Sequence, residues 1–103
     1  MKYIVLMPDY TGSCIRDEFE GEIAVESLNL PKEIFNEITV WHNSYRKIIP
    51  LSEEERRQRI EEIEKLDAQG LKLAKRLKTL VPGGAKVKYF SERKLKYSTL
   101  IFI

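Results

Sequence analysis

The sequence predicts an α+β protein in two layers, with two amphipathic helices packed on one face of a mixed sheet of three or four strands. Three observations support this: apolar, β-rich runs near both ends of the chain, two long segments with helical periodicity between them, and Pro or Gly where these segments stop. The predicted order is β-(β)-α-α-β-β. A length of 103 residues, with 43% hydrophobic and 33% charged residues, indicates a single globular domain spanning 1–103.

The first strand is predicted at residues 3–7, a continuous apolar run that stops at Pro8. A run that is apolar at every position is typical of a strand buried on both faces, so we expect it at the centre of the sheet. A weaker pattern after Gly21 predicts an optional second strand at residues 22–25.

The first helix is predicted to begin near Pro31, with Asn29 or Leu30 as its cap, and to end at Pro50. Its apolar residues recur at intervals of three, four and seven, which is the spacing of one helix face. These residues are Ile34, Phe35, Ile38, Trp41, Tyr45, Ile48 and Ile49. We therefore expect Trp41 and Tyr45 to lie in the core.

The second helix is predicted to begin at Ser52, which forms a capping box with Glu55, and to end at residues 82–84, Pro-Gly-Gly. Gly70 interrupts its apolar stripe and indicates either a tight helix contact or a bend. The stripe comprises Ile60, Ile63, Leu66, Leu73, Ala74, Leu77 and Leu80.

Two further strands are predicted at residues 85–90 and 96–103, joined by residues 91–95 as an antiparallel hairpin. In the first of them, Val87 and Tyr89 alternate with Lys86 and Lys88, as expected for a sheet with one solvated face. The two intervening helices make the strand at 3–7 and the strand at 85–90 parallel if they are neighbours.

Residues 9–22 form a loop with two glycines, one arginine and five acidic residues, without strand or helix periodicity. Loops carry binding residues more often than the elements that support them. The charge is also uneven, because residues 1–50 carry a net −3 and residues 51–103 a net +5. The candidate partner-binding residues are Asp9, Tyr10, Arg16, Asp17, Glu18, Phe19, Glu20 and Glu22.

No residue pattern predicts catalysis, a metal site or a cofactor. The chain has one histidine, His42, and one cysteine, Cys14, and a nucleophilic pair made from them lacks a motif for the third, orienting group. The carboxylates of the acidic loop lack the spacing of a calcium loop. A single cysteine suits a reducing compartment, and no run is long enough for a signal peptide or a membrane span. We therefore expect a cytoplasmic protein without a membrane partner.

Basic and aromatic residues near the C-terminus leave a second hypothesis open, a small RNA-binding domain that uses the C-terminal hairpin. These residues are Lys86, Lys88, Lys94, Lys96, Tyr89, Phe90 and Tyr97. The alternation in this strand places Tyr89 in the core, where it cannot stack on a base. This favours a solvated sheet face over an RNA-binding surface. A third hypothesis is a dimer that pairs through an exposed strand edge. Its alternative is a protein that is monomeric on its own.

One further pattern extends through the first half of the chain and into the first helix. It consists of Asp9-Tyr10, Gly12-Ser13, Ile15-Arg16-Asp17, Gly21 and residues 26–31, followed by Trp41 and Tyr45. It resembles the immunity proteins of contact-dependent growth inhibition systems, small bacterial proteins encoded beside polymorphic toxins. The resemblance implies a non-enzymatic inhibitor that binds a cognate toxin C-terminal domain, such as a nuclease, and blocks its active site.

In such an inhibitor, the loop carboxylates would mimic a phosphate backbone and pair with basic residues of the toxin. Charge complementarity of this kind speeds encounter and selects the partner. Buried anchors such as Tyr10 or Phe19 would supply much of the affinity.

Overall fold

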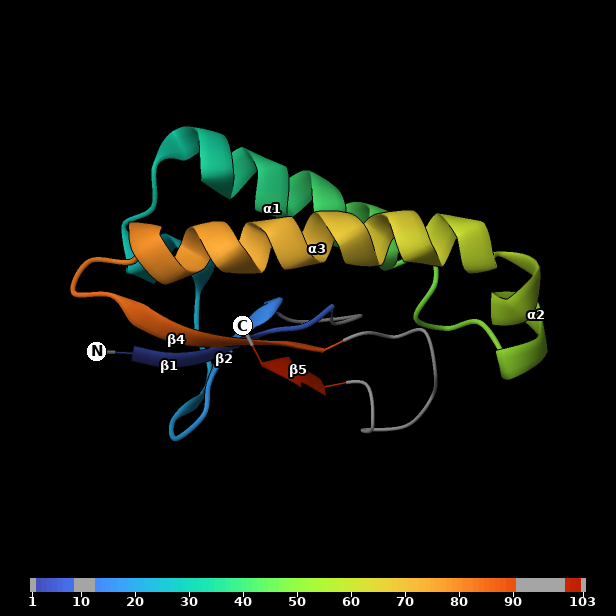
Figure 1. Cartoon of the computed structure of the whole chain (residues 1–103), viewed down its shortest axis with the longest axis horizontal. Helices are drawn as coiled ribbons and strands as arrows, with labels where there is room; N and C mark the ends of the chain where they lie inside the picture. The colour runs from blue at the N-terminus through green and yellow to red at the C-terminus, as the bar shows by residue number, and fades with distance from the viewer. Residues whose placement is uncertain (1, 9–12, 91–99, 103) are drawn as a thin grey trace.

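The computed structural model describes residues 2–8, 13–90 and 100–102, and shows helices stacked on one face of a mixed sheet (Figure 1). Its elements are β1 (Lys2–Leu6), β2 (Ile15–Asp17), β3 (Gly21–Glu22), the short 3-10 helix η1 (Val25–Leu28), α1 (Lys32–Tyr45), α2 (Glu53–Gln58), α3 (Ile60–Leu80), β4 (Ala85–Phe90) and β5 (Leu100–Phe102). The strand order is β3-β2-β1-β4-β5. The predicted α+β class is confirmed, with five strands in place of three or four.

Strand β1 occupies the centre of the sheet, antiparallel to β2 and parallel to β4. Both the central position and the parallel pairing with β4 were predicted. The prediction that both faces of this strand are buried was wrong. Ile4 and Leu6 are fully buried under the helices, whereas Tyr3 is 38% exposed and Val5 and Met7 are half-buried. The helices cover only one face, so the strand alternates despite its apolar sequence.

The acidic segment contains more strand than expected. The sequence did not predict β2. The second strand predicted at residues 22–25 lies earlier in the chain, since β3 ends at Glu22 and η1 begins at Val25. Strands of three and two residues are too short to show a period of two. They form because Ile15 pairs with Leu6 of β1 and is itself fully buried.

Helix α1 is shorter than predicted at both ends. Pro31 is its N-cap, in place of Asn29 or Leu30, since Asn29 adopts a left-handed conformation with φ 53° at the end of η1. The helix ends at Tyr45, and turns lead from there to Pro50. Its buried face carries Ile34, Ile38, Trp41, His42 and Tyr45. The predicted core positions of Trp41 and Tyr45 are confirmed, with both side chains fully buried.

The predicted second helix is two helices, with the break at Arg59 and not at Gly70. The capping box is present, since the Ser52 Oγ accepts from the Glu55 N–H at 3.2 Å and the Glu55 carboxylate accepts from the Ser52 N–H at 3.2 Å. This hydrogen bonding to the Ser52 backbone lowers the pKa of Glu55. The Arg56 guanidinium donates to the Ile49 carbonyl at 2.5 Å and the Leu51 carbonyl at 3.1 Å, which ties α2 to the preceding turns.

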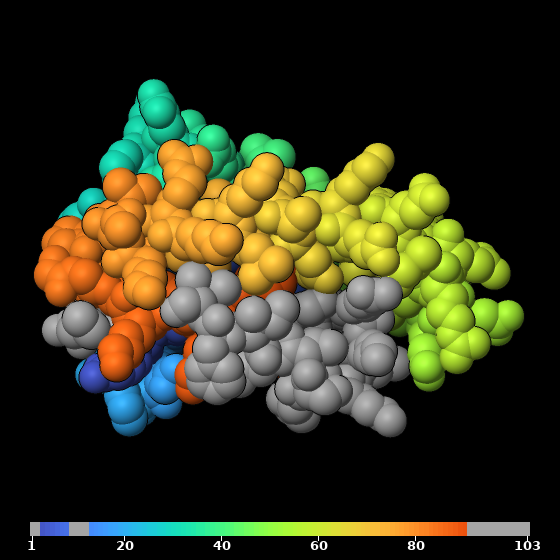
Figure 2. Space-filling model, viewed as in Figure 1, coloured from blue at the N-terminus to red at the C-terminus, as the bar shows by residue number. Residues whose placement is uncertain are grey.

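Helix α3 runs without interruption through Gly70 and along the front of the molecule in Figure 2. The ring of Tyr89 in β4 packs directly on this glycine, so Gly70 serves a tight contact and not a bend. Tyr89 is fully buried, as predicted. The hydroxyls of Tyr45 and Tyr89 each donate to Asp67 Oδ1 at 2.7 Å, which joins α1, α3 and β4. Burial, reinforced by the Asp67 carboxylate, raises the pKa of Tyr89 well above its ordinary range.

Strand β4 has the predicted bounds, and β5 pairs with it antiparallel, as expected for the hairpin. Val87 and Tyr89 are buried, while Lys86 is exposed and Lys88 is half-buried on the other face. The predicted loop at 91–95, which includes Lys94, lies outside the described residues, as do Lys96 and Tyr97 at the start of the predicted last strand.

Candidate partner-binding surface

The turn between β2 and β3 is ordered by its own side chain and displays an aromatic ring. Asp17 Oδ1 accepts from the N–H groups of Phe19 and Glu20, at 2.8 and 3.1 Å, and Gly21 completes the turn at φ +87°. A short carboxylate that binds the backbone two and three residues later is a common turn device. The consequence is that Phe19 stands at the surface with 79% of its area exposed.

Phe19 nevertheless has neighbours on the face of the sheet that points away from the helices, here called the outer face. Its ring meets the ring of Tyr3 edge to face, with centroids 5.6 Å apart. The Lys86 ammonium lies over the Tyr3 ring, 5.9 Å from its centroid. Edge-to-face and cation–π contacts restrict the orientation of these side chains. Phe19 is therefore held in position while exposed.

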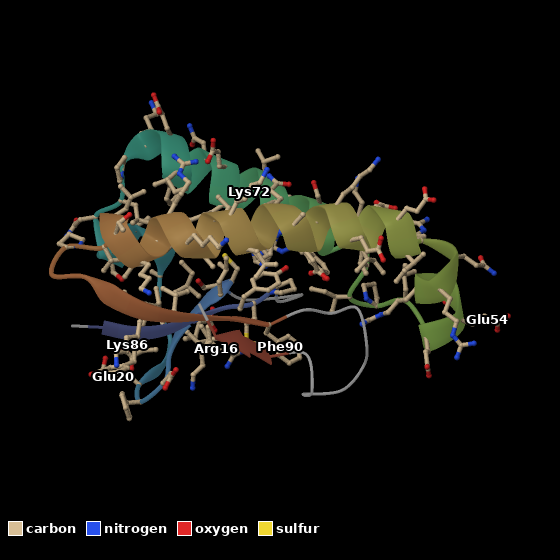
Figure 3. The ribbon with its side chains drawn as sticks, in the orientation of Figure 1. Arg16, Glu20, Glu54, Lys72, Lys86 and Phe90 are labelled. Atoms are coloured by element: carbon tan, nitrogen blue, oxygen red, sulfur yellow. The ribbon has the colours of Figure 1, made fainter. Side chains whose placement is uncertain are left out.

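Several charged side chains belong to the same region, and Figure 3 labels Arg16, Glu20 and Lys86 among them. The Glu18 carboxylate is 3.0 Å from the Lys88 ammonium, and the two side chains are only 23% and 29% exposed. Arg16 and Lys88 both pair with Val5 across the sheet, so they lie on the same outer face. Glu20 is exposed at the turn, next to Phe19. We name Tyr3, Glu18, Phe19, Glu20 and Lys86 the turn surface.

The structure brings most of the predicted binding residues to this region. Arg16 and Asp17 belong to β2, and Glu18, Phe19 and Glu20 form the turn. Glu22 lies in β3, where its carboxylate accepts from the Ser13 N–H. Asp9 and Tyr10 lie outside the described residues.

Two members of the turn surface were missing from the predicted site. Tyr3 and Lys86 are directly paired across β1 and β4, 83 residues apart in sequence. The alternation in β4 indicated an outward Lys86, but only the pairing places it beside Tyr3. Such long-range register has no local signal in the sequence.

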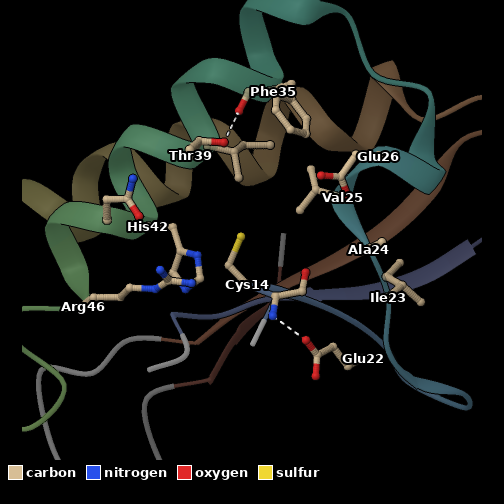
Figure 4. A pocket seen from close by; sticks show the side chains of 13 residues that line it. Cys14, Glu22, Ile23, Ala24, Val25, Glu26, Phe35, Thr39, His42 and Arg46 are labelled. Atoms are coloured by element: carbon tan, nitrogen blue, oxygen red, sulfur yellow. Dashed lines mark hydrogen bonds between the residues drawn. The ribbon is translucent and has the colours of Figure 1, made fainter. Parts of the chain in front are cut away.

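A pocket of about 610 Å³ lies on the helix side of the sheet, between α1 and the segment that carries β3 and η1 (Figure 4). Cys14 and His42 project into it from opposite sides and are only 1% and 7% exposed. The sequence placed them on separate elements and left open whether they meet, and the structure brings both to one pocket. Its lining residues are Ser13, Cys14, Glu22, Ile23, Ala24, Val25, Glu26, Phe35, Ile38, Thr39, His42, Asn43 and Arg46.

The described part of the chain contains neither a metal-binding cluster nor a membrane-spanning helix. No group of three or more His, Cys, Asp or Glu residues there is arranged to hold a metal ion. Among the helices described, none combines the length and apolar character needed to cross a membrane.

Comparison with protein families matches residues 2–92 to the family described as Serratia CdiI immunity protein-like. The matched range contains β1 to β4, all the helices, the turn surface and the pocket. A search of curated proteins found no match.

Proposed function

Since the chain belongs to the family of Serratia CdiI immunity protein-like proteins, we propose that it neutralises one cognate toxin by covering that toxin's active site, without catalysis of its own. Proteins of this family are immunity proteins of contact-dependent growth inhibition, and they bind a cognate toxin protein. The finer proposal is that the toxin is a nuclease and that the turn surface docks into its substrate cleft.

The observation that carries the proposal is Phe19, which is 79% exposed in an ordered turn between two carboxylates. Aromatic anchors dominate the binding energy of protein interfaces. An anchor that is already oriented loses less conformational entropy on binding. Phe19 has both properties, because Asp17 holds its backbone and Tyr3 contacts its ring.

The charges on the turn surface suit a nuclease. A cleft that binds nucleic acid carries Lys and Arg against the phosphates. Glu20 is exposed beside the anchor and presents a carboxylate to such a cleft, while Glu18 on the other side of Phe19 in sequence is already paired with Lys88. Complementary charge accelerates encounter and excludes partners of the wrong sign.

Replacing Phe19 by alanine is expected to weaken toxin binding by about 30-fold, the equivalent of about 2 kcal/mol for an interface hot spot. The measurement is calorimetric titration of the purified protein with the toxin domain encoded by the adjacent gene. Val40→Ala is the matched control, because Val40 is also an exposed apolar residue, at 63%, but lies on α1. Equal affinity for wild type and Phe19→Ala would remove Phe19 as the anchor.

Reversing the charge of Glu20 with Glu20→Lys is expected to slow association with the toxin, most strongly at low salt. Exposed interface charges act mainly on the association rate, and screening weakens them above about 0.15 M ionic strength. The control is Glu54→Lys, which makes the same charge change at the distant α2 (Figure 3). Equal slowing by both variants would show that the effect is one of net charge and not of the turn surface. Asp17 is left unchanged in this test because it orders the turn.

The RNA-binding hypothesis draws some support from Lys86 and Lys88, which lie on the outer face beside the exposed Tyr3. The carboxylates of Glu18 and Glu20 oppose it, since they repel phosphates at the same place. We expect no RNA to be retained by the wild-type protein in a gel-shift assay at low salt. Retention that falls with salt and is lost in Lys86→Ala would favour RNA binding instead.

A further inference from the structure

The pocket beneath α1 lies on the helix side of the sheet, and the edge strand β3 links it to the turn surface on the outer face. Glu22 of β3 lines the pocket and follows Glu20 by only two residues. A volume of about 610 Å³ falls within the ~300–1,000 Å³ typical of ligand sites. A protein docked on the turn surface would reach this cavity by extending around the β3 edge of the sheet.

The walls of the pocket suit a long aliphatic chain. Ile23, Val25 and Phe35 line it and are half-buried, so each presents apolar surface that a partner could cover. Val25 and Ile23 also pack against the edge of the core cluster. Lys and Arg side chains bury their methylene stems on surface of this kind while their charged ends stay in polar surroundings.

The charges favour a cation at one rim. Glu22 and Glu26 both come from the β3–η1 side and are exposed, and the Glu22 carboxylate is oriented by the Ser13 N–H (Figure 4). Arg46 lies at the other side, next to His42, on the C-terminal part of the α1 region. Two carboxylates against one guanidinium leave the pocket with a net negative charge, concentrated at the β3–η1 rim.

We propose that this pocket receives an arginine or lysine side chain of the cognate toxin. The stem of that side chain lies against Val25 and Phe35, and its charged end pairs with Glu22 and Glu26. This inference rests on the proposed function, because the occupant belongs to the toxin. A toxin that binds nucleic acid carries such basic side chains around its substrate cleft.

Thr39 provides the test. It lines the pocket from α1, it is exposed, and its hydroxyl donates only to the Phe35 carbonyl of its own helix, at 3.0 Å. Thr39→Lys places a cation in the pocket, and Thr39→Glu places a carboxylate of similar reach there. With a basic occupant, we expect Thr39→Lys to weaken binding of the toxin domain encoded by the adjacent gene by about tenfold or more. Thr39→Glu should bind as tightly as wild type or more tightly.

The matched controls are Val40→Lys and Val40→Glu. Val40 is β-branched like Thr39, follows it on the same helix and is 63% exposed, but does not line the pocket. Both controls are expected to bind within about twofold of wild type, as is usual for surface changes. Thermal unfolding of all four variants verifies that each is folded.

The outcomes separate the inference from the proposed function. Weaker binding by Thr39→Glu with unchanged binding by Thr39→Lys would mean an acidic occupant and would overturn the inference. Wild-type affinity in both Thr39 variants would mean that the pocket stays empty in the complex, and would also overturn it while the proposed function stands. Absence of binding by the wild-type protein would overturn both.

Discussion

Replacing Trp41 by alanine should lower the free energy of unfolding by about 3–5 kcal/mol, as large-to-small changes in a core do. Trp41 is fully buried, and its ring centroid lies 5.7 Å from that of Tyr45 and 6.2 Å from that of Tyr89. Its indole N–H donates to the Leu66 carbonyl at 2.9 Å. The substitution would therefore leave a cavity between α1, α3 and β4, and a buried carbonyl without this donor.

Urea denaturation of wild type and Trp41→Ala measures this loss. Val40→Ala serves as the control, because it truncates an exposed residue at the adjacent position. If Trp41→Ala were as stable as wild type but failed to bind the toxin, Trp41 would be an interface anchor and its assignment to the core would be wrong.

Replacing Gly70 by alanine should also destabilise the protein, although alanine favours a helix over glycine by about 1 kcal/mol. A Cβ at this position would lie 2.6 Å from Cζ of Tyr89 and would overlap Cε1 and the hydroxyl oxygen as well. The ring is held by its bond to Asp67 and by complete burial, so it has little room to move. Over-packing of this kind typically costs about 1–3 kcal/mol.

A double-mutant cycle with Tyr89→Leu isolates the cause of that loss. The shorter leucine removes the ring from Gly70, so Gly70→Ala should cost much less in the Tyr89→Leu background. Gln69→Ala is the control for helix propensity, because Gln69 is the exposed neighbour on α3. If Gly70→Ala raised the free energy of unfolding in the background that retains Tyr89, the tight contact would be contradicted.

Several elements of this fold can be predicted from the sequence because their signals are local. The capping box of Ser52 and Glu55, the bounds of β4 and the buried stripe through Trp41 and Tyr45 follow from short-range spacing and hydrogen bonding. The α+β class follows from the order of these elements, since each must bury one apolar face. The acidic loop was recognised as a candidate surface because its residues fit neither helix nor strand.

Features that depend on long-range pairing have no such local signal and emerge only in the folded protein. Strands β2 and β3 are too short to show periodicity. They form because β2 pairs with β1 and β3 pairs with β2. The exposed outer side of β1 and the meeting of Tyr3 with Lys86 and Phe19 also depend on neighbours far away in sequence. The pocket arises in the same way, because α1 and the β3–η1 segment enclose it only after both have packed on the core. Residue type and local spacing do not indicate which distant segments will come into contact. A local pattern therefore predicts an element but not the surface that several elements form together.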